Sequence, residues 1–147
     1  MTTPPQRFEG KDTTVPEREL VDGDQFRSNP RTEEDLARDL TGIDTRATVP
    51  LIATLYYDAE PEDTPFLSIG LGAPDSVLVY SSGLRNEQGG ISRGARVGDT
   101  TEHPFRYGDV TNHYPATALI PKQAALQAAR EFFRTGQRPT GVDWDDA

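Results

Sequence analysis

The side chains best suited to catalysis lie between residues 92 and 113. Ser92, His103, Asp109 and His113 would supply a nucleophile, two imidazoles and a carboxylate to a small hydrolase. However, no Gly-x-Ser-x-Gly elbow surrounds a serine. The two histidines are ten residues apart, which is not a spacing that places two metal ligands on one helix face. A small hydrolase or ligand-binding domain that uses His103, Asp109 and His113 is therefore an alternative, and hydrogen bonding within a loop or sheet is the plainer interpretation of both imidazoles.

Other patterns that bind ligands in proteins are incomplete in this sequence. Gly70 and Gly72 lack the third glycine and the following helix of a dinucleotide-binding loop. The acidic run at residues 58–63 lacks the central glycine and the closing glutamate of a calcium loop. The chain has no cysteine, which excludes disulfides, thiol nucleophiles and zinc ribbons. We therefore expect no catalytic residue, no metal and no cofactor.

The charge of the chain is strongly acidic and unevenly distributed. The formal net charge is −9, and residues 32–65 carry nine acidic side chains against two arginines. Such a field repels nucleic acid and accelerates encounters with basic proteins. A solvated helix face followed by a polar loop would give the same composition. A general mimic of nucleic acid that binds basic proteins is thus a further possibility.

The N-terminal sequence and the longest apolar run indicate where in the cell the protein is expected. The N-terminus MTTPPQRFEG lacks the basic start and apolar core of a secretory signal. The longest apolar run, at residues 51–57, is too short to cross a bilayer. We expect a cytoplasmic protein that does not contact a membrane.

Hydrophobic spacing and breaker residues predict one domain. Residues 1–31 are rich in proline and poor in apolar residues, which indicates a flexible or loosely docked arm. Residues 32–147 then form a single α+β domain, with a helix from the N-cap Thr32 to the stop signal Gly42. A second helix is expected from Pro121 to Gly136.

Between the two helices, the apolar runs predict strands near residues 48–57, 66–72, 76–82 and 91–97, and a hairpin is expected around Gly108 and Asp109. The expected fold is an antiparallel sheet of four to five strands that is covered by an N-terminal and a C-terminal helix.

The C-terminal sequence EFFRTGQRPTGVDW, residues 131–144, resembles the signature of a bacterial immunity-protein family. This is the family numbered one among the immunity proteins of polymorphic toxin systems, which are common in actinobacteria. ISRG at residues 91–94, and the pairs Tyr107–Gly108, Tyr114–Pro115 and Ile120–Pro121, resemble the middle of that family. The signature residues in this chain are Phe132, Phe133, Thr135, Gly136, Arg138, Pro139 and Trp144.

The resemblance implies a non-enzymatic antitoxin. It would bind and block the C-terminal domain of a cognate toxin, often a nucleic-acid deaminase, without contacting nucleic acid itself. Clustered carboxylates and aromatic anchors suit such an interface. The interpretation that one tyrosine faces the core and the loop is merely solvated is also open. The partner-binding candidates are Tyr56, Tyr57, Asp58, Glu60, Glu62 and Asp63.

For the signature itself we expect a structural role. Gly136 allows the helix to end, and Pro139 prevents its continuation. Trp144 is expected to fold back against Phe132 or Phe133.

Overall fold

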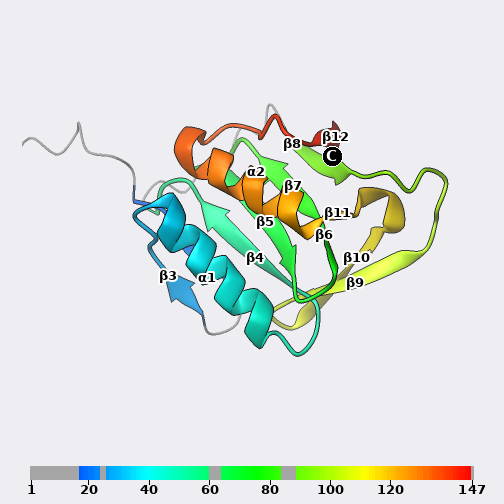
Figure 1. The fold of residues 1–147 in the computed structure, drawn as a ribbon, viewed down its shortest axis with the longest axis horizontal. Helices are drawn as coiled ribbons and strands as arrows, with labels where there is room; N and C mark the ends of the chain where they lie inside the picture. Colours follow the sequence, from blue (N-terminus) through cyan, green and yellow to red (C-terminus); the bar gives the residue numbers. More distant parts are fainter. Residues whose placement is uncertain (1–16, 24–25, 60–63, 84–88, 147) are drawn as a thin grey trace, which may run out of the picture.

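The computed structural model describes residues 17–23, 26–59, 64–83 and 89–146, and it shows an α+β fold (Figure 1). The elements in chain order are β2 (Glu19–Val21), β3 (Arg27–Ser28), α1 (Glu33–Arg46), β4 (Leu51–Tyr56), β5 (Phe66–Leu71), β6 (Asp75–Ser76), β7 (Leu78–Ser81), β8 (Gly89–Arg93), β9 (Glu102–Tyr107), β10 (Val110–Pro115), a 3-10 turn (Ala116–Ala118), β11 (Ile120–Pro121), α2 (Lys122–Thr135) and β12 (Asp143–Asp145).

The main sheet is large and almost wholly antiparallel. Its strand order is β10-β9-β4-β5-β7-β8-β12, and β2 pairs with β4 and β3. The one parallel contact in the described sheet joins β4 to β9 through Leu51 and Arg106. β11 and β6 form a separate two-stranded sheet. The antiparallel α+β fold is therefore confirmed.

The expected strand count of four to five is too low, because the described residues form a nine-stranded sheet. The additional strands β2, β3 and β12 have only two or three residues each, which is too short to show an alternating pattern. β9 and β10 do form the expected hairpin, with Tyr107 and Val110 paired across its turn.

Helix α1 begins as expected but runs further. The Thr32 side chain accepts a hydrogen bond from the Asp35 amide at 3.0 Å. The predicted end at Gly42 is wrong, because the helix continues to Arg46. Ile43 is buried and extends the apolar face of Leu36 and Leu40, which offsets the cost of about 1 kcal/mol for a glycine inside a helix.

Helix α2 ends as expected. Gly136 adopts a left-handed conformation with φ of 70°, and its amide bonds to the carbonyl of Phe132. No helix among the described residues has the length and apolarity needed to span a membrane.

Both helices pack on one face of the sheet (Figure 1). Ala53 and Leu55 of β4 point toward them, and Ile52 points to the opposite face, since neighbouring side chains alternate along a strand. On that opposite face a smaller apolar cluster gathers around Phe105 of β9 and the 3-10 turn. The β9–β10 hairpin thus covers part of the sheet that the helices leave uncovered.

The described part of the predicted N-terminal arm is built into the sheet. Leu20 lies opposite Leu55 of β4 and is fully buried. Arg18 is only 5% exposed. Residues 1–16 lie outside the described residues.

Candidate partner-binding surface

Tyr56 lines an open groove on the side of the sheet opposite the helices. The groove has a volume of about 620 Å³, and its walls include Phe26, Tyr107 and the ion pair between Glu19 and Arg27. The Tyr56 ring lies 5.7 Å from that of Phe66. Burial raises the pKa of the Tyr56 hydroxyl, and its hydrogen bond with Tyr107 raises the pKa further. A neutral phenol in a groove can provide both packing area and a hydrogen bond to a partner.

Tyr57 points the other way, toward α2. Its ring meets Phe132 edge to face at 6.1 Å. The Arg18 guanidinium lies 4.5 Å from its centroid. A side chain at Gly136 would come within 3.0 Å of the same ring. The structure therefore separates the two candidate tyrosines, with Tyr56 in the groove and Tyr57 packed against the helix.

The acidic loop begins at Asp58, two residues after Tyr56 in the chain. The Asp58 amide donates to the Thr64 hydroxyl at 2.9 Å, and the Ala59 amide donates to the Glu17 carbonyl at 2.6 Å. These bonds hold both described ends of the loop against β4 and the chain before β2. The remaining predicted carboxylates, Glu60, Glu62 and Asp63, lie outside the described residues.

Helix α1 presents its acids mainly to basic residues of α2. Glu33 contacts Arg130 at 3.2 Å and Arg134 at 3.0 Å. Asp44 contacts Lys122 at 2.7 Å. These three cations offset part of the negative charge counted over residues 32–65. This pairing could not be predicted from the sequence, because the basic partners lie between 78 and 101 residues further along the chain.

The two histidines do not converge on one site. His103 lies opposite Tyr114 in the hairpin, and His113 lies opposite Pro104. Directly opposed residues share a face of a sheet and consecutive residues do not. His103 and His113 consequently point to opposite faces, and Asp109 lies in the turn, beyond the last paired residues.

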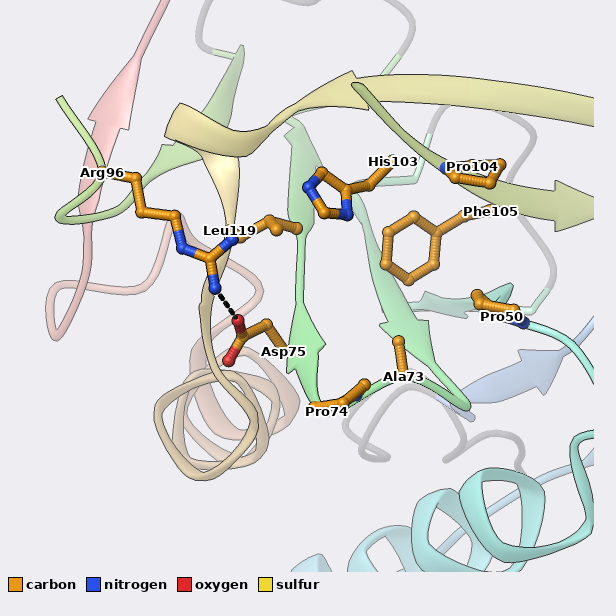
Figure 2. A pocket seen from close by; sticks show the side chains of 9 residues that line it. All are labelled: Pro50, Ala73, Pro74, Asp75, Arg96, His103, Pro104, Phe105 and Leu119. Atoms are coloured by element: carbon orange, nitrogen blue, oxygen red, sulfur yellow. Dashed lines mark hydrogen bonds and ion pairs between the residues drawn. The ribbon is translucent and has the colours of Figure 1, made fainter. Parts of the chain in front are cut away.

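His103 instead lines a mainly apolar pocket of about 240 Å³ (Figure 2). Its imidazole and the Phe105 ring project from β9 into the pocket, and Asp75 and Arg96 form an ion pair at 2.8 Å on another side. Ser92, the nucleophile that a hydrolase would use, is buried and donates to the Ala118 carbonyl at 2.7 Å. Within the described part of the chain, no group of three or more histidine and carboxylate side chains is placed to hold a metal ion.

The C-terminal signature lies where α2 meets the end of the sheet. Phe132 is fully buried and contacts the rings of Tyr57 and Tyr80. Phe133 is 7% exposed, and Thr135 ends the helix by accepting a bond from the Gln137 amide.

Trp144, in β12, packs against the aromatic residues at this end of the sheet. Its ring contacts Tyr80 at 6.4 Å, and Tyr80 in turn contacts Phe132. The indole N–H donates to the carbonyl of Pro139 at 2.8 Å. Arg138 lies 5.6 Å from the indole and donates to the Gly89 carbonyl.

Arg18 is a residue that the sequence reasoning missed. Its guanidinium lies 4.5 Å from both the Tyr57 and the Phe133 ring and donates to the Phe133 carbonyl near the end of α2. Burial lowers the pKa of this arginine. No local pattern distinguishes a buried arginine from the exposed arginines of a polar segment.

A model of one protein family, described as immunity protein Imm1, matches residues 30–146. The match runs from before α1 to β12 and so includes both helices and most of the sheet. No curated protein matches the chain.

Proposed function

The chain belongs to the Imm1 family of immunity proteins, and from this premise we propose that it protects its producer by binding one cognate toxin domain. The observation that carries the proposal is the extent of the family match, which includes nearly all of the described fold. The resemblance at the C-terminal signature led to the same family.

We further propose that the toxin is a nucleic-acid deaminase and that the chain blocks it by occlusion. The resemblance to the family implies this class of toxin. A deaminase that acts on nucleic acid needs a basic path to its zinc-bound water. A chain with net charge −9 is complementary to such a path.

The groove around Tyr56 and the adjoining acidic loop are our proposed contact surface. Aromatic anchors with carboxylates close by suit a tight interface, and the rings of this groove are half-buried. Tyr56 and Tyr107 line the groove, and the Phe66 ring packs against Tyr56. Asp58 begins the acidic loop two residues after Tyr56. Because Tyr57 packs against α2, we assign it a supporting role behind this surface.

Co-expression with the toxin domain encoded beside this gene tests the function. We expect cells that express the toxin alone to stop growing and to accumulate deaminated bases in their nucleic acid, and we expect the chain to reverse both effects. Growth arrest by the toxin without accumulation of deaminated bases would contradict a deaminase target. Failure to rescue growth with a folded chain would contradict the immunity function.

Binding kinetics test the acidic loop. Converting Asp58, Glu60, Glu62 and Asp63 to their amides should slow association roughly tenfold at low salt and less at high salt, because charge complementarity acts mainly on the encounter rate and is screened by salt. A matched control replaces four exposed acids elsewhere, Glu34, Asp143, Asp145 and Asp146, and produces the same change in net charge. Equal association rates for both quadruple variants would remove the loop from the interface.

A further inference from the structure

Strand β10 is an edge of the main sheet with an exposed and uncharged sequence. It is the terminal strand in the sheet order, and five of its six residues are exposed. Its sequence, VTNHYP, carries no carboxylate, lysine or arginine. Uncovered edges of this kind are templates for pairing with another chain, and proteins usually protect them with charge, proline or short length.

The other edges of this sheet are protected in those ways. β12 has three residues, of which two are aspartates, and Asp145 forms an ion pair with Arg93. β3 has only two residues and includes Arg27. Among the described edge strands, β10 is therefore the one that is six residues long and carries no acidic or basic side chain other than a histidine.

The register shows which backbone groups of β10 face outward. The Arg106 amide donates to the Pro50 carbonyl, away from β10. Arg106 and its partner Thr111 are consequently a pair without mutual hydrogen bonds, and such pairs alternate with bonded ones along an antiparallel ladder. By the same alternation, Pro104 and His113 are also a pair without mutual hydrogen bonds. A proline is compatible with this position, because it has no N–H to donate to the facing strand. The N–H and C=O groups of Thr111 and His113 thus point outward from the sheet.

Acidic side chains stand at both ends of this edge. Glu102 lies opposite Pro115 at one end, and Asp109 lies in the turn at the other. Both are exposed, and neither forms an ion pair within the described residues. The six-residue strand separates them by about 17–20 Å, the usual length of such a strand.

We propose that the cognate toxin adds a strand to the β10 edge. This proposal rests on the immunity function proposed above and specifies its contact surface. The occupant is an extended segment of a basic domain that bonds to the backbone of Thr111 and His113 and carries cationic side chains near Glu102 and Asp109. Strand addition of this kind obtains its affinity from main-chain hydrogen bonds.

The location of the hairpin tip joins this edge to the groove of Tyr56. Tyr107, the last residue of β9, lines that groove and hydrogen-bonds with Tyr56. The groove and the β10 edge can therefore contact one partner together. A second copy of the chain is a poorer occupant, because two chains of charge −9 repel each other.

Hydrogen exchange in the native protein tests the proposal without a mutation. In the complex with the toxin domain, exchange of the Thr111 and His113 amides should slow at least tenfold relative to the free chain. The Asn112 amide, which already faces β9, provides an internal comparison. If the chain inhibits the toxin but leaves these two amides unprotected, the edge proposal is wrong and the immunity function stands. If these amides become protected without toxin as the protein concentration rises, the occupant is a second copy and the proposal is also wrong.

A variant pair tests the contribution of the outward amide to binding. His113→Pro removes an outward N–H without removing a hydrogen bond to β9, and His113→Ala removes the imidazole but keeps the amide. We expect His113→Pro to accelerate dissociation of the toxin complex at least tenfold and His113→Ala to change it less than threefold. Equal dissociation rates in two folded variants would overturn the proposal, and the exchange measurement decides the matter if His113→Pro does not fold.

Discussion

Arg18 shows how a single residue outside the family match can support the fold. Its guanidinium lies between two aromatic rings, and it donates to the last turn of α2. A cation is favourable at the negative end of a helix dipole. Cation–π contacts also gain strength when they are shielded from water. We therefore regard Arg18 as a connection between the chain that precedes β2 and α2.

Replacing Arg18 by alanine should lower the free energy of unfolding by about 2–3 kcal/mol, the combined effect of a shielded cation–π contact and a lost charged hydrogen bond. Arg18→Lys keeps the charge but loses the planar stacking, so it should recover only part of this stability. Denaturant unfolding of the three proteins provides the measurement. Unchanged stability in Arg18→Ala would show that the cation–π contacts and the hydrogen bond of Arg18 do not stabilise the fold.

Trp144 is the residue through which the structural role of the C-terminal signature is best tested. Trp144→Ala should lower the free energy of unfolding by about 3 kcal/mol, the lower end of the cost for a deleted aromatic, since the indole is partly exposed. Trp144→Phe should cost about 1 kcal/mol, because it keeps a ring but loses the hydrogen bond to Pro139. Thermal unfolding checks both values. An unchanged midpoint in Trp144→Ala would move this residue from a structural role to an interface role.

At the scale of elements, regions with strong periodicity were predictable and short ones were not. The boundaries of α2 follow from Pro121, its apolar face and Gly136. The central strands follow from their apolar runs. In contrast, β2 pairs only three residues with β4, and its stability depends on tertiary contacts with Leu55. A local pattern contains no information about such a partner.

Leu20 tests whether β2 is part of the folded domain, although the family match begins only at residue 30. The side chain is fully buried against β4. Leu20→Ala should therefore reduce the free energy of unfolding by about 3–5 kcal/mol, as for a leucine in a well-packed core. Val21→Ala, at the partly exposed neighbouring position, is the matched control and should cost less. Similar small losses for both variants would indicate that β2 is only loosely docked.

For the molecule as a whole, one part of the proposed contact surface was suggested by the sequence and the other part only by the structure. The Tyr56–Asp58 region was recognisable because aromatic and acidic residues adjoin in sequence. The β10 edge was not, since its exposure depends on the strand order and its outward amides depend on the register. The pairing of α1 acids with cations of α2 was not predictable for a similar reason, because it depends on how the two helices pack.

The placement of the histidines predicts that they can be replaced without loss of protection. His103 and His113 point to opposite faces of the hairpin, and His103 lines a pocket built mainly from apolar residues. The double variant His103→Gln, His113→Gln should rescue cells from the toxin as well as the native chain does. A folded double variant that fails to protect would restore the hydrolase or metal-site alternative.

The most direct test of the proposed occlusion is the inhibition of the purified toxin domain as the concentrations of the chain and of the proposed nucleic-acid substrate are varied. Occlusion predicts complete inhibition at one chain per toxin domain, and it predicts that raising the substrate concentration weakens the inhibition, because both ligands compete for one basic surface. Full toxin activity in the presence of excess folded chain would contradict neutralisation by binding. Inhibition that is independent of substrate, with nucleic acid still bound in a ternary complex, would contradict occlusion.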